Sequence, residues 1–208
     1  MSPSKSSPAP DGVPCGQAGR LTLRRFRPED AGDVAALHTL PEVRAHLSDD
    51  HPLQELAVAQ LMVQRLLDFY PRQPGLGIWH ASDAAGFVGW FSLMPLAERA
   101  GAIDLGSRLH PRAWGSGIAL DGGECLLAHA FHTLGAAQVW GACAPANRGA
   151  RLCLHALGFS AEGIHTYDRH PALHHRLSAA HWQHWSRTPR RERLRHAVAC
   201  TRDAHACH

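Results

Sequence analysis

The stretch that decides the fold reads Ala102-Ile-Asp-Leu-Gly-Ser-Arg-Leu-His-Pro-Arg-Ala-Trp-Gly-Ser-Gly-Ile-Ala119. Between Ile103 and Leu109 the apolar residues fall on one face at a period of two, which is typical of a β-strand. Pro111 ends this strand, because proline has no N–H to donate to a neighbouring strand. After a turn with two glycines, a helix is predicted to begin at about Gly117 or Ile118.

A strand, a glycine turn and a helix N-terminus in succession form an anion-binding site, since free N–H groups and the helix dipole point at the same place. Gly115 and Gly117 permit backbone angles that other residues avoid, and they let a ligand approach the backbone. No Gly-Lys-Ser/Thr ending follows, so the stretch is not a nucleotide-triphosphate P-loop. A dinucleotide fingerprint is excluded too, because the third glycine and the later carboxylate are missing. An ordinary strand-to-helix turn remains the alternative.

Three segments resemble one known family in the same order along the chain. Trp114-Gly-Ser-Gly-Ile-Ala119 resembles the pyrophosphate loop of the GNAT superfamily of N-acetyltransferases, Gln/Arg-x-x-Gly-x-Gly/Ala, with tryptophan at the first position as in the ribosomal-protein N-terminal (RimJ/RimL-like) branch. Asn147-Arg-Gly-Ala-Arg-Leu-Cys-Leu-His-Ala-Leu-Gly-Phe159 resembles the Asn-x-x-Ser…Leu-Gly-Phe block of that branch. Leu23-Arg-Arg-Phe-Arg-Pro-Glu-Asp30 resembles its opening strand and helix, and the resemblance covers residues 21–185.

The resemblance implies an α/β fold with a mixed, mainly antiparallel central sheet flanked by helices. The sheet should split between its fourth and fifth strands, here Ala102–His110 and Ala137–Cys143. Predicted strands alternate with predicted helices, which independently favours an α/β class. The other expected strands are Leu21–Phe26, Gly77–Ser82, Phe87–Met94, Phe159–Thr166 and Leu173–Ala179. The expected helices are Pro28–Thr39, a short piece from Pro41 to Leu47, Leu53–Tyr70, Ile118–Leu134 and Asn147–Ala156.

Three regions are expected along the chain. Residues 1–20 are rich in Ser, Pro and Gly without an apolar core segment, which indicates a disordered leader rather than a secretory signal. Residues 21–185 form the predicted N-acetyltransferase domain. Residues 186–208 form a basic tail with His and Cys, expected to be an exposed helix or frayed end that is dispensable for transfer. A contact of this tail with RNA or an acidic partner is one alternative, and a metal site formed by its His and Cys residues is another.

Composition sets further limits. The chain has 208 residues and a formal net charge of +3, which makes nucleic acid an unlikely partner. No apolar run is long enough to cross a bilayer. The six cysteines lack Cys-x-x-Cys spacing, and reduced thiols in the core would suit a cytoplasmic protein. No metal is expected, and a homodimer is compatible with these features.

The co-substrate implied by the resemblance is acetyl-coenzyme A. The backbone of the glycine loop would hold its pyrophosphate, the edge of the Ala102–His110 strand would pair with its pantetheine arm, and Asn147 would bind from the other side of the split. Arg112 could add charge beside the loop, where Ser116 replaces the Lys or Arg of many relatives. The residues expected to contact the coenzyme are Ser107, Arg108, Leu109, Arg112, Trp114, Gly115, Ser116, Gly117, Ile118, Ala119 and Asn147.

The implied reaction needs an unprotonated amine, so a base is expected. Asp104 lies where the branch often carries a carboxylate and is the candidate, although pairing with Arg108 along the strand is an alternative. Glu98 and His110 are weaker candidates for the base. The positions where relatives carry a hydroxyl to protonate the leaving thiolate are Ala150 and Leu154 here, which leaves Cys143, Cys153, His155 or water for that role.

The acceptor expected from the resemblance is a protein or peptide N-terminal α-amine. An α-amine has a pKa of about 8, against about 10.4 for lysine, and is the easiest of these amines to deprotonate. A polyamine or an antibiotic is the alternative acceptor. A weakly catalytic protein that binds coenzyme A, or one associated with RNA, also stays open.

Overall fold

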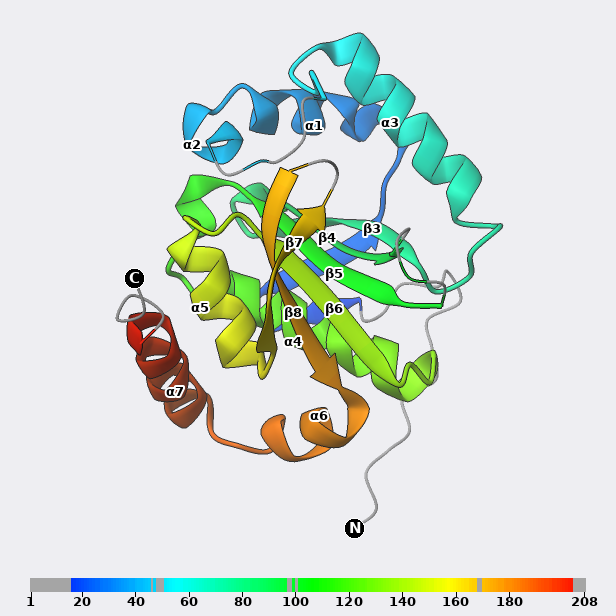
Figure 1. The fold of residues 1–208 in the computed structure, drawn as a ribbon. Coiled ribbons are helices and arrows are strands. Elements are labelled where there is room, and N and C mark those ends of the chain that lie inside the picture. The colour runs from blue at the N-terminus through cyan, green and yellow to red at the C-terminus, as the bar shows by residue number, and fades with distance from the viewer. Residues whose placement is uncertain are drawn as a thin grey trace.

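An eight-stranded sheet forms the centre of the structure, a computed structural model that describes residues 16–45, 47, 51–96, 99, 101–167 and 170–203. The strand order is β1-β2-β3-β4-β5-β6-β8-β7, and neighbouring strands are antiparallel except for β5 and β6 (Figure 1). The strands are β1 Gln17–Ala18, β2 Leu21–Arg25, β3 Gly77–Asp83, β4 Gly86–Pro95, β5 Ile103–Leu109, β6 Gln138–Cys143, β7 Ser160–Tyr167 and β8 His170–Ser178. The expected mixed, mainly antiparallel α/β fold is confirmed.

Helices cover both faces of this sheet. The helical segments are η1 Pro28–Asp30, α1 Ala31–His38, α2 Pro41–Arg44, α3 Leu56–Phe69, η2 Pro111–Ala113, α4 Ile118–Ala128, η3 His129–Thr133, α5 Arg148–Leu157, α6 Ala179–Trp185 and α7 Arg190–Asp203. Several bounds differ from the sequence-based prediction by one to three residues, among them the start of α3. A turn precedes α3, which therefore begins three residues after Leu53. Beyond Ala128, α4 widens into a π-helical turn in which the N–H of Leu134 donates to the carbonyl of His129.

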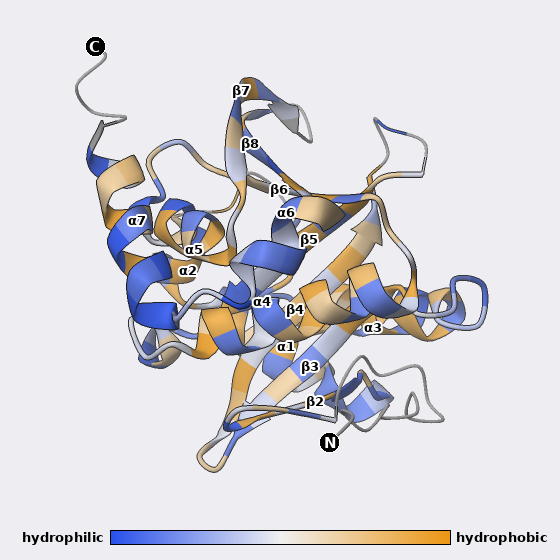
Figure 2. Cartoon of the chain, turned by 90° about the horizontal axis from the view of Figure 1, so that it is seen from below, coloured by the Kyte–Doolittle hydropathy of each residue, from blue (hydrophilic) through white to orange (hydrophobic). Residues whose placement is uncertain are grey.

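The alternation of side chains along the strands creates two apolar cores. Trp79 and Phe91 point to one face, where they pack with residues of α4 and α5. Ile78 and Trp90 point to the opposite face, where α1 and α3 supply the packing partners. Figure 2 shows hydrophobic residues interspersed with hydrophilic ones along the strands. The two cores therefore lie on opposite faces of the sheet.

The split lies between β5 and β6, the fourth and fifth of the expected strands. These two strands pair only through Ile103 with Val139 and Asp104 with Trp140. Beyond that point β6 stays paired with β8, whereas β5 stays paired with β4. The edge of β5 from Leu105 onwards therefore opens towards a gap in the sheet, at the position predicted from the sequence.

Two adjacent glycines let α4 lie close to its neighbours. A Cβ on Gly122 would come within 2.2 Å of the Phe91 ring, and a Cβ on Gly123 within 2.7 Å of Leu157. Glycine inside a helix costs about 1 kcal/mol relative to alanine. The close packing of α4 on β4 and α5 explains why this cost is tolerated here.

We expect Gly122→Ala to lower the free energy of unfolding by about 1–3 kcal/mol, because the new methyl group overlaps the Phe91 ring and forces it to move. Gly32→Ala on α1 is the matched control, since a Cβ there meets no atom within 4 Å. The control should be neutral or stabilising by up to about 1 kcal/mol. Urea denaturation of both variants tests this, and equal stabilities would contradict the packing of α4 on Phe91.

The C-terminal helix is part of the folded body, which corrects the expectation of an exposed or frayed tail. Helix α7 lies alongside α5 (Figure 1), with Ala197 fully buried and Arg193 only 5% exposed. The indole N–H of Trp185, at the end of α6, donates to the carbonyl of Ala156 on α5. The sequence did not reveal this packing, because α7 is mostly hydrophilic (Figure 2) and contacts α5 through alanine and arginine rather than a large apolar stripe.

The folded body also begins earlier than residue 21. Ala18 of β1 is buried and pairs with Leu21 of β2.

Cys143 and Cys153 are free thiols, whereas Cys125 is disulfide-bonded, which corrects the expectation that the core cysteines are all reduced. In the part of the chain that the structure describes, no helix is both long enough and apolar enough to cross a membrane.

Candidate active site

Two cavities meet at the split. A large one of about 750 Å³ lies on the α3 face of the sheet, and a small one of about 90 Å³ lies on the α4 and α5 face. The alternation of β5 sends Asp104 and Arg108 to the large cavity and Leu105 to the small one. The residues that line both cavities are Gly106, Ser107, Ala142 and Ala150. Two molecules that enter from opposite faces can therefore meet at these four residues.

The glycine loop joins β5 to α4 through η2. Gly117 is the N-cap of α4 with φ of +87°, a conformation that side chains with a Cβ rarely adopt. The indole N–H of Trp114 donates to the carbonyl of Leu109 at 3.0 Å, so this side chain braces the loop against the strand. The Ser116 hydroxyl donates to the carbonyl of Ala113 at 2.6 Å. The first N–H groups of α4, from Ile118 and Ala119, are left pointing out of the helix end.

The positive charge at this loop comes from residues that sequence reasoning missed. Arg20 donates to the carbonyl oxygen of Ser116, and the guanidinium of Arg190 lies 3.9 Å from where a Cβ on Gly117 would stand. Arg112, expected to add charge to the loop, instead binds Asp83 at 2.9 and 3.1 Å. Its guanidinium also donates to the carbonyls of residues 86 and 87 in the β3–β4 hairpin. Arg112 is therefore occupied by the hairpin, which corrects its expected side-chain role.

Asn147 stands on the other side of the split. Its side-chain oxygen accepts from the N–H of Ala150 at 3.0 Å, which caps α5, and the residue also lines the large cavity. The N-termini of α4 and α5 thus both follow a strand at the split. Because each helix end carries positive partial charge, the region between them favours an anionic ligand.

Asp104 is 9% exposed and lines the large cavity. Arg108 on the same face stacks on the Trp90 ring at 5.3 Å and donates to His38 Nε2 at 2.6 Å. Arginine can only donate, so His38 must carry its proton on Nδ1, which bonds to the Val34 carbonyl at 2.8 Å. The guanidinium of Arg108 is therefore oriented by the α1 side of the cavity.

Of the two weaker candidates for the base, the structure describes only His110. His110 Nδ1 accepts from the N–H of Arg112 at the start of η2, and His110 lines neither cavity. Glu98 lies outside the described residues.

The candidate acids are thiols that stay protonated at neutral pH. Burial raises the pKa of Cys143 to about 11 and that of Cys153 to about 12. Cys143 lines the large cavity and Cys153 the small one, whereas Ala150 and Leu154 occupy the positions of the family hydroxyls. Burial lowers the pKa of His155, whose Nδ1 faces the carbonyl of Phe159 at 3.2 Å. A thiol with so high a pKa is a weaker acid than the thiol of coenzyme A, so neither cysteine is a strong general acid.

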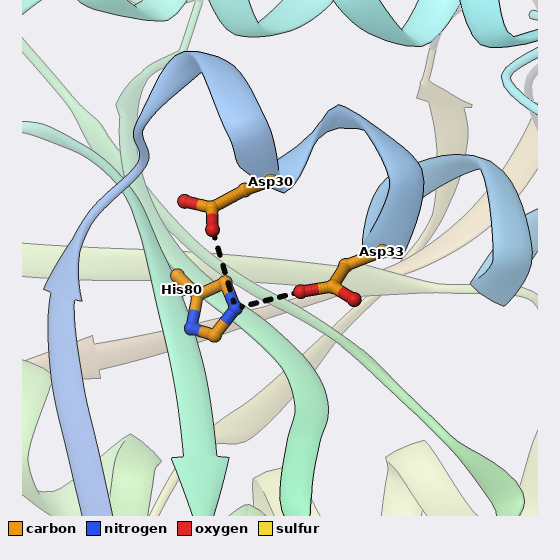
Figure 3. Close-up of side chains that lie close together, drawn as sticks. All are labelled: Asp30, Asp33 and His80. Carbon is orange, nitrogen blue, oxygen red and sulfur yellow. Dashed lines mark hydrogen bonds and ion pairs between the residues drawn. The ribbon is translucent and has the colours of Figure 1, made fainter.

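A cluster that could hold a metal ion lies between α1 and β3, apart from the lining of both cavities (Figure 3). His80 Nε2 lies 3.2 Å from Asp33 and 3.9 Å from Asp30. Both oxygens of Asp30 already accept from Arg24, at 2.6 and 2.7 Å. Burial alone would raise the pKa of Asp30, but the hydrogen bonds from Arg24 and from the Arg27 N–H hold it below the usual value. A metal ion would have to displace the guanidinium, so these residues act as a structural ion-pair network.

The fold, its split and the strand–glycine–helix junction are those expected of an acyltransferase that uses a coenzyme A thioester. Residues 20–160 match the family described as acetyltransferase (GNAT) domain. The chain therefore belongs to the GNAT family of acetyltransferases.

Similar proteins agree with this family. The FsC-acetyl coenzyme A-N(2)-transacetylase of Aspergillus fumigatus is 28% identical over 127 residues, which cover 58% of this chain and 54% of that protein. The match thus spans about half the length of that relative. Mycobacterium smegmatis RimJ in complex with CoA-disulfide has a TM-score of 0.67 at 19% identity, covering 90% of this chain and 91% of that one.

A second solved structure, the ribosomal-protein-S5-alanine acetyltransferase of Vibrio fischeri, has a TM-score of 0.68 at 16% identity, covering 80% of this chain and 97% of that one. At these low identities the solved structures bear on the fold alone. The named relatives differ in their acceptors, so the acceptor of this chain has to be argued from its own cavity.

Proposed function

We propose that this enzyme transfers the acetyl group to the N-terminal α-amine of a protein or peptide. The observation that carries the proposal is the pair of cavities that meet at Gly106, Ser107, Ala142 and Ala150. The coenzyme enters along the α4 and α5 side, with its pyrophosphate on the N–H groups of the glycine loop and its pantetheine arm along the open edge of β5. The acceptor enters through the large cavity on the α3 side.

In this arrangement the reaction runs between the two faces of the sheet. The amine nitrogen attacks the thioester carbonyl carbon, and Asp104 accepts a proton from the nitrogen. A backbone N–H of β5 near Ser107 to Leu109 stabilises the oxyanion of the tetrahedral intermediate. The carbon–sulfur bond then breaks, leaving the amide and the thiolate of coenzyme A. The thiolate is a stable leaving group that needs no proton from the protein, because a free thiol has a pKa of about 8.5, and it takes its proton from solvent after release.

The charge of the large cavity supports an α-amine over a polyamine. Among its lining residues that the structure describes, Asp104 is the one carboxylate, whereas Arg65 and Arg108 are both cationic. Of the other acids expected near the acceptor entrance, Glu55 and Asp68 do not line it, and residues 49 and 50 lie outside the described part of the chain. A polycation needs several converging carboxylates to balance its charge. The mainly apolar wall from α3 fits the first residues of a peptide better.

The names of the similar proteins indicate two classes of acceptor. RimJ and the ribosomal-protein-S5-alanine acetyltransferase are structural neighbours, and the transacetylase from Aspergillus fumigatus is similar in sequence. A small-molecule amine is therefore the second candidate acceptor. Within that class too, the described lining of the cavity, with Asp104 as its one carboxylate, favours a monoamine over a polyamine.

We expect a short peptide with a free N-terminus to be acetylated with a kcat/KM at least about tenfold above that of an N-blocked lysine peptide, because a larger fraction of the α-amine is unprotonated near neutral pH. Spermidine should be a weaker substrate than the free peptide. Release of coenzyme A, followed with a thiol reagent at one pH for all three amines, measures the order. A clear preference for spermidine would overturn the proposed acceptor.

A further inference from the structure

Helix α4 carries two acidic side chains close to the proposed phosphate site. Asp121 lies in the first turn of the helix, and Glu124 follows one turn later. An acidic group in the first turn is stabilised by the helix dipole. The phosphates of the coenzyme would use the same positive end of α4. The two carboxylates would therefore interact with the same positive helix end as the phosphates of the coenzyme, and they would repel these phosphates.

The C-terminal helix supplies cations at these two carboxylates. Arg190 donates to Asp121 at 2.7 Å and to Glu124 at 2.9 Å. Arg193, buried against α5, donates to the second oxygen of Glu124 at 2.7 Å. Two arginines of α7 thus face two acids of α4, and one of these arginines lies beside Gly117.

We propose that Arg190 is a positioning residue for the coenzyme, which neutralises Asp121 and Glu124 so that the N-terminus of α4 can accept the phosphates of acetyl-coenzyme A. The proposal rests on the proposed function of the glycine loop. It assigns an electrostatic role in the active site to a helix that lies beyond residue 185. It also accounts for Ser116, since the charge absent from the loop is supplied by α7 and by Arg20.

The geometry fits neutralisation better than a purely structural bridge. The side chain of Arg190 keeps 39% of its surface exposed, so its charge is felt at the loop surface, whereas Arg193 at 6% is enclosed. Opposite charges a few ångströms apart largely cancel at a distance, so a phosphate on the loop meets little net charge from α4. Without Arg190 the same phosphate would face the uncompensated Asp121.

The test compares the dissociation constants of acetyl-coenzyme A and of acetyl-pantetheine, which has the same thioester but no phosphates. We expect Arg190→Gln to raise the constant for acetyl-coenzyme A by roughly tenfold and to leave that for acetyl-pantetheine unchanged. At about 0.5 M salt the difference should shrink, because exposed charges are screened. Arg191→Gln, the next residue on α7 and exposed, is the control that removes the same charge without weakening either ligand.

A variant in which Arg190→Gln is combined with Asp121→Asn and Glu124→Gln should regain the affinity for acetyl-coenzyme A, because the repulsion is removed with the cation. An affinity that stays low in this variant would overturn neutralisation. Equal weakening of both ligands by Arg190→Gln, or no weakening of either, would also overturn it. Gly117→Val separates this inference from the proposed function: if it leaves the affinity for acetyl-coenzyme A intact, the loop itself is not the coenzyme site.

Discussion

Gly117→Val is expected to abolish binding of acetyl-coenzyme A, with a rise in the dissociation constant of at least about a hundredfold. The backbone at Gly117 has φ of +87°, which a β-branched residue adopts only under strain. Relief of that strain would turn the first N–H groups of α4 away from the proposed pyrophosphate position. A valine side chain would also occupy the space through which a phosphate approaches the backbone. Titration calorimetry on the variant measures the loss directly.

The matched control for this prediction is Gly135→Val. Gly135 has φ of +66°, and a Cβ there meets no atom within 4 Å, so the substitution imposes comparable backbone strain away from the loop. The control should lose stability but keep its affinity for acetyl-coenzyme A. Equal affinities of the Gly117 variant and the wild type would show that the coenzyme binds elsewhere, and equal losses in both variants would point to a general effect of strain.

Asp104→Asn is expected to lower turnover by at least about tenfold, because a positioned base contributes a factor of roughly 10²–10⁴. The side chain lines the large cavity, on the face of β5 opposite the small cavity in which the coenzyme is proposed to lie. The affinity for acetyl-coenzyme A should therefore change little. The residual turnover of the variant should rise with pH, because the amine then loses its proton without help.

Steady-state rates with a peptide acceptor, together with coenzyme affinity, test the role of Asp104. Asp68→Asn on α3 makes the same carboxylate-to-amide change outside both cavities and should leave turnover unchanged. A folded Asp104 variant with wild-type turnover would assign proton removal to water. A parallel loss of coenzyme affinity would mean that Asp104 shapes the split rather than serving as the base.

Much of the candidate site follows from patterns within short segments of sequence. The alternation between Ile103 and Leu109 predicts a strand, and it also separates Asp104 from Leu105 onto opposite faces. The glycines of the loop and the helix that follows are equally local signals. The sheet, its split and the family were predicted from these segments and are confirmed. Such features depend on residues close together in the chain, so their periodicity and turn chemistry are visible without a structure.

Other parts of the site were decided only by the tertiary structure. Arg20 reaches Ser116 across 96 residues, and Arg190 reaches Asp121 across 69. Arg112, although adjacent to the loop in sequence, turns to Asp83 because the β3–β4 hairpin offers a carboxylate and two carbonyls within reach. An arginine has the same local signature whether it is solvated or paired. Its role depends on which distant group the folded backbone brings near, which is decided by the position of α7 beside α4 for Arg190 and by the β3–β4 hairpin for Arg112.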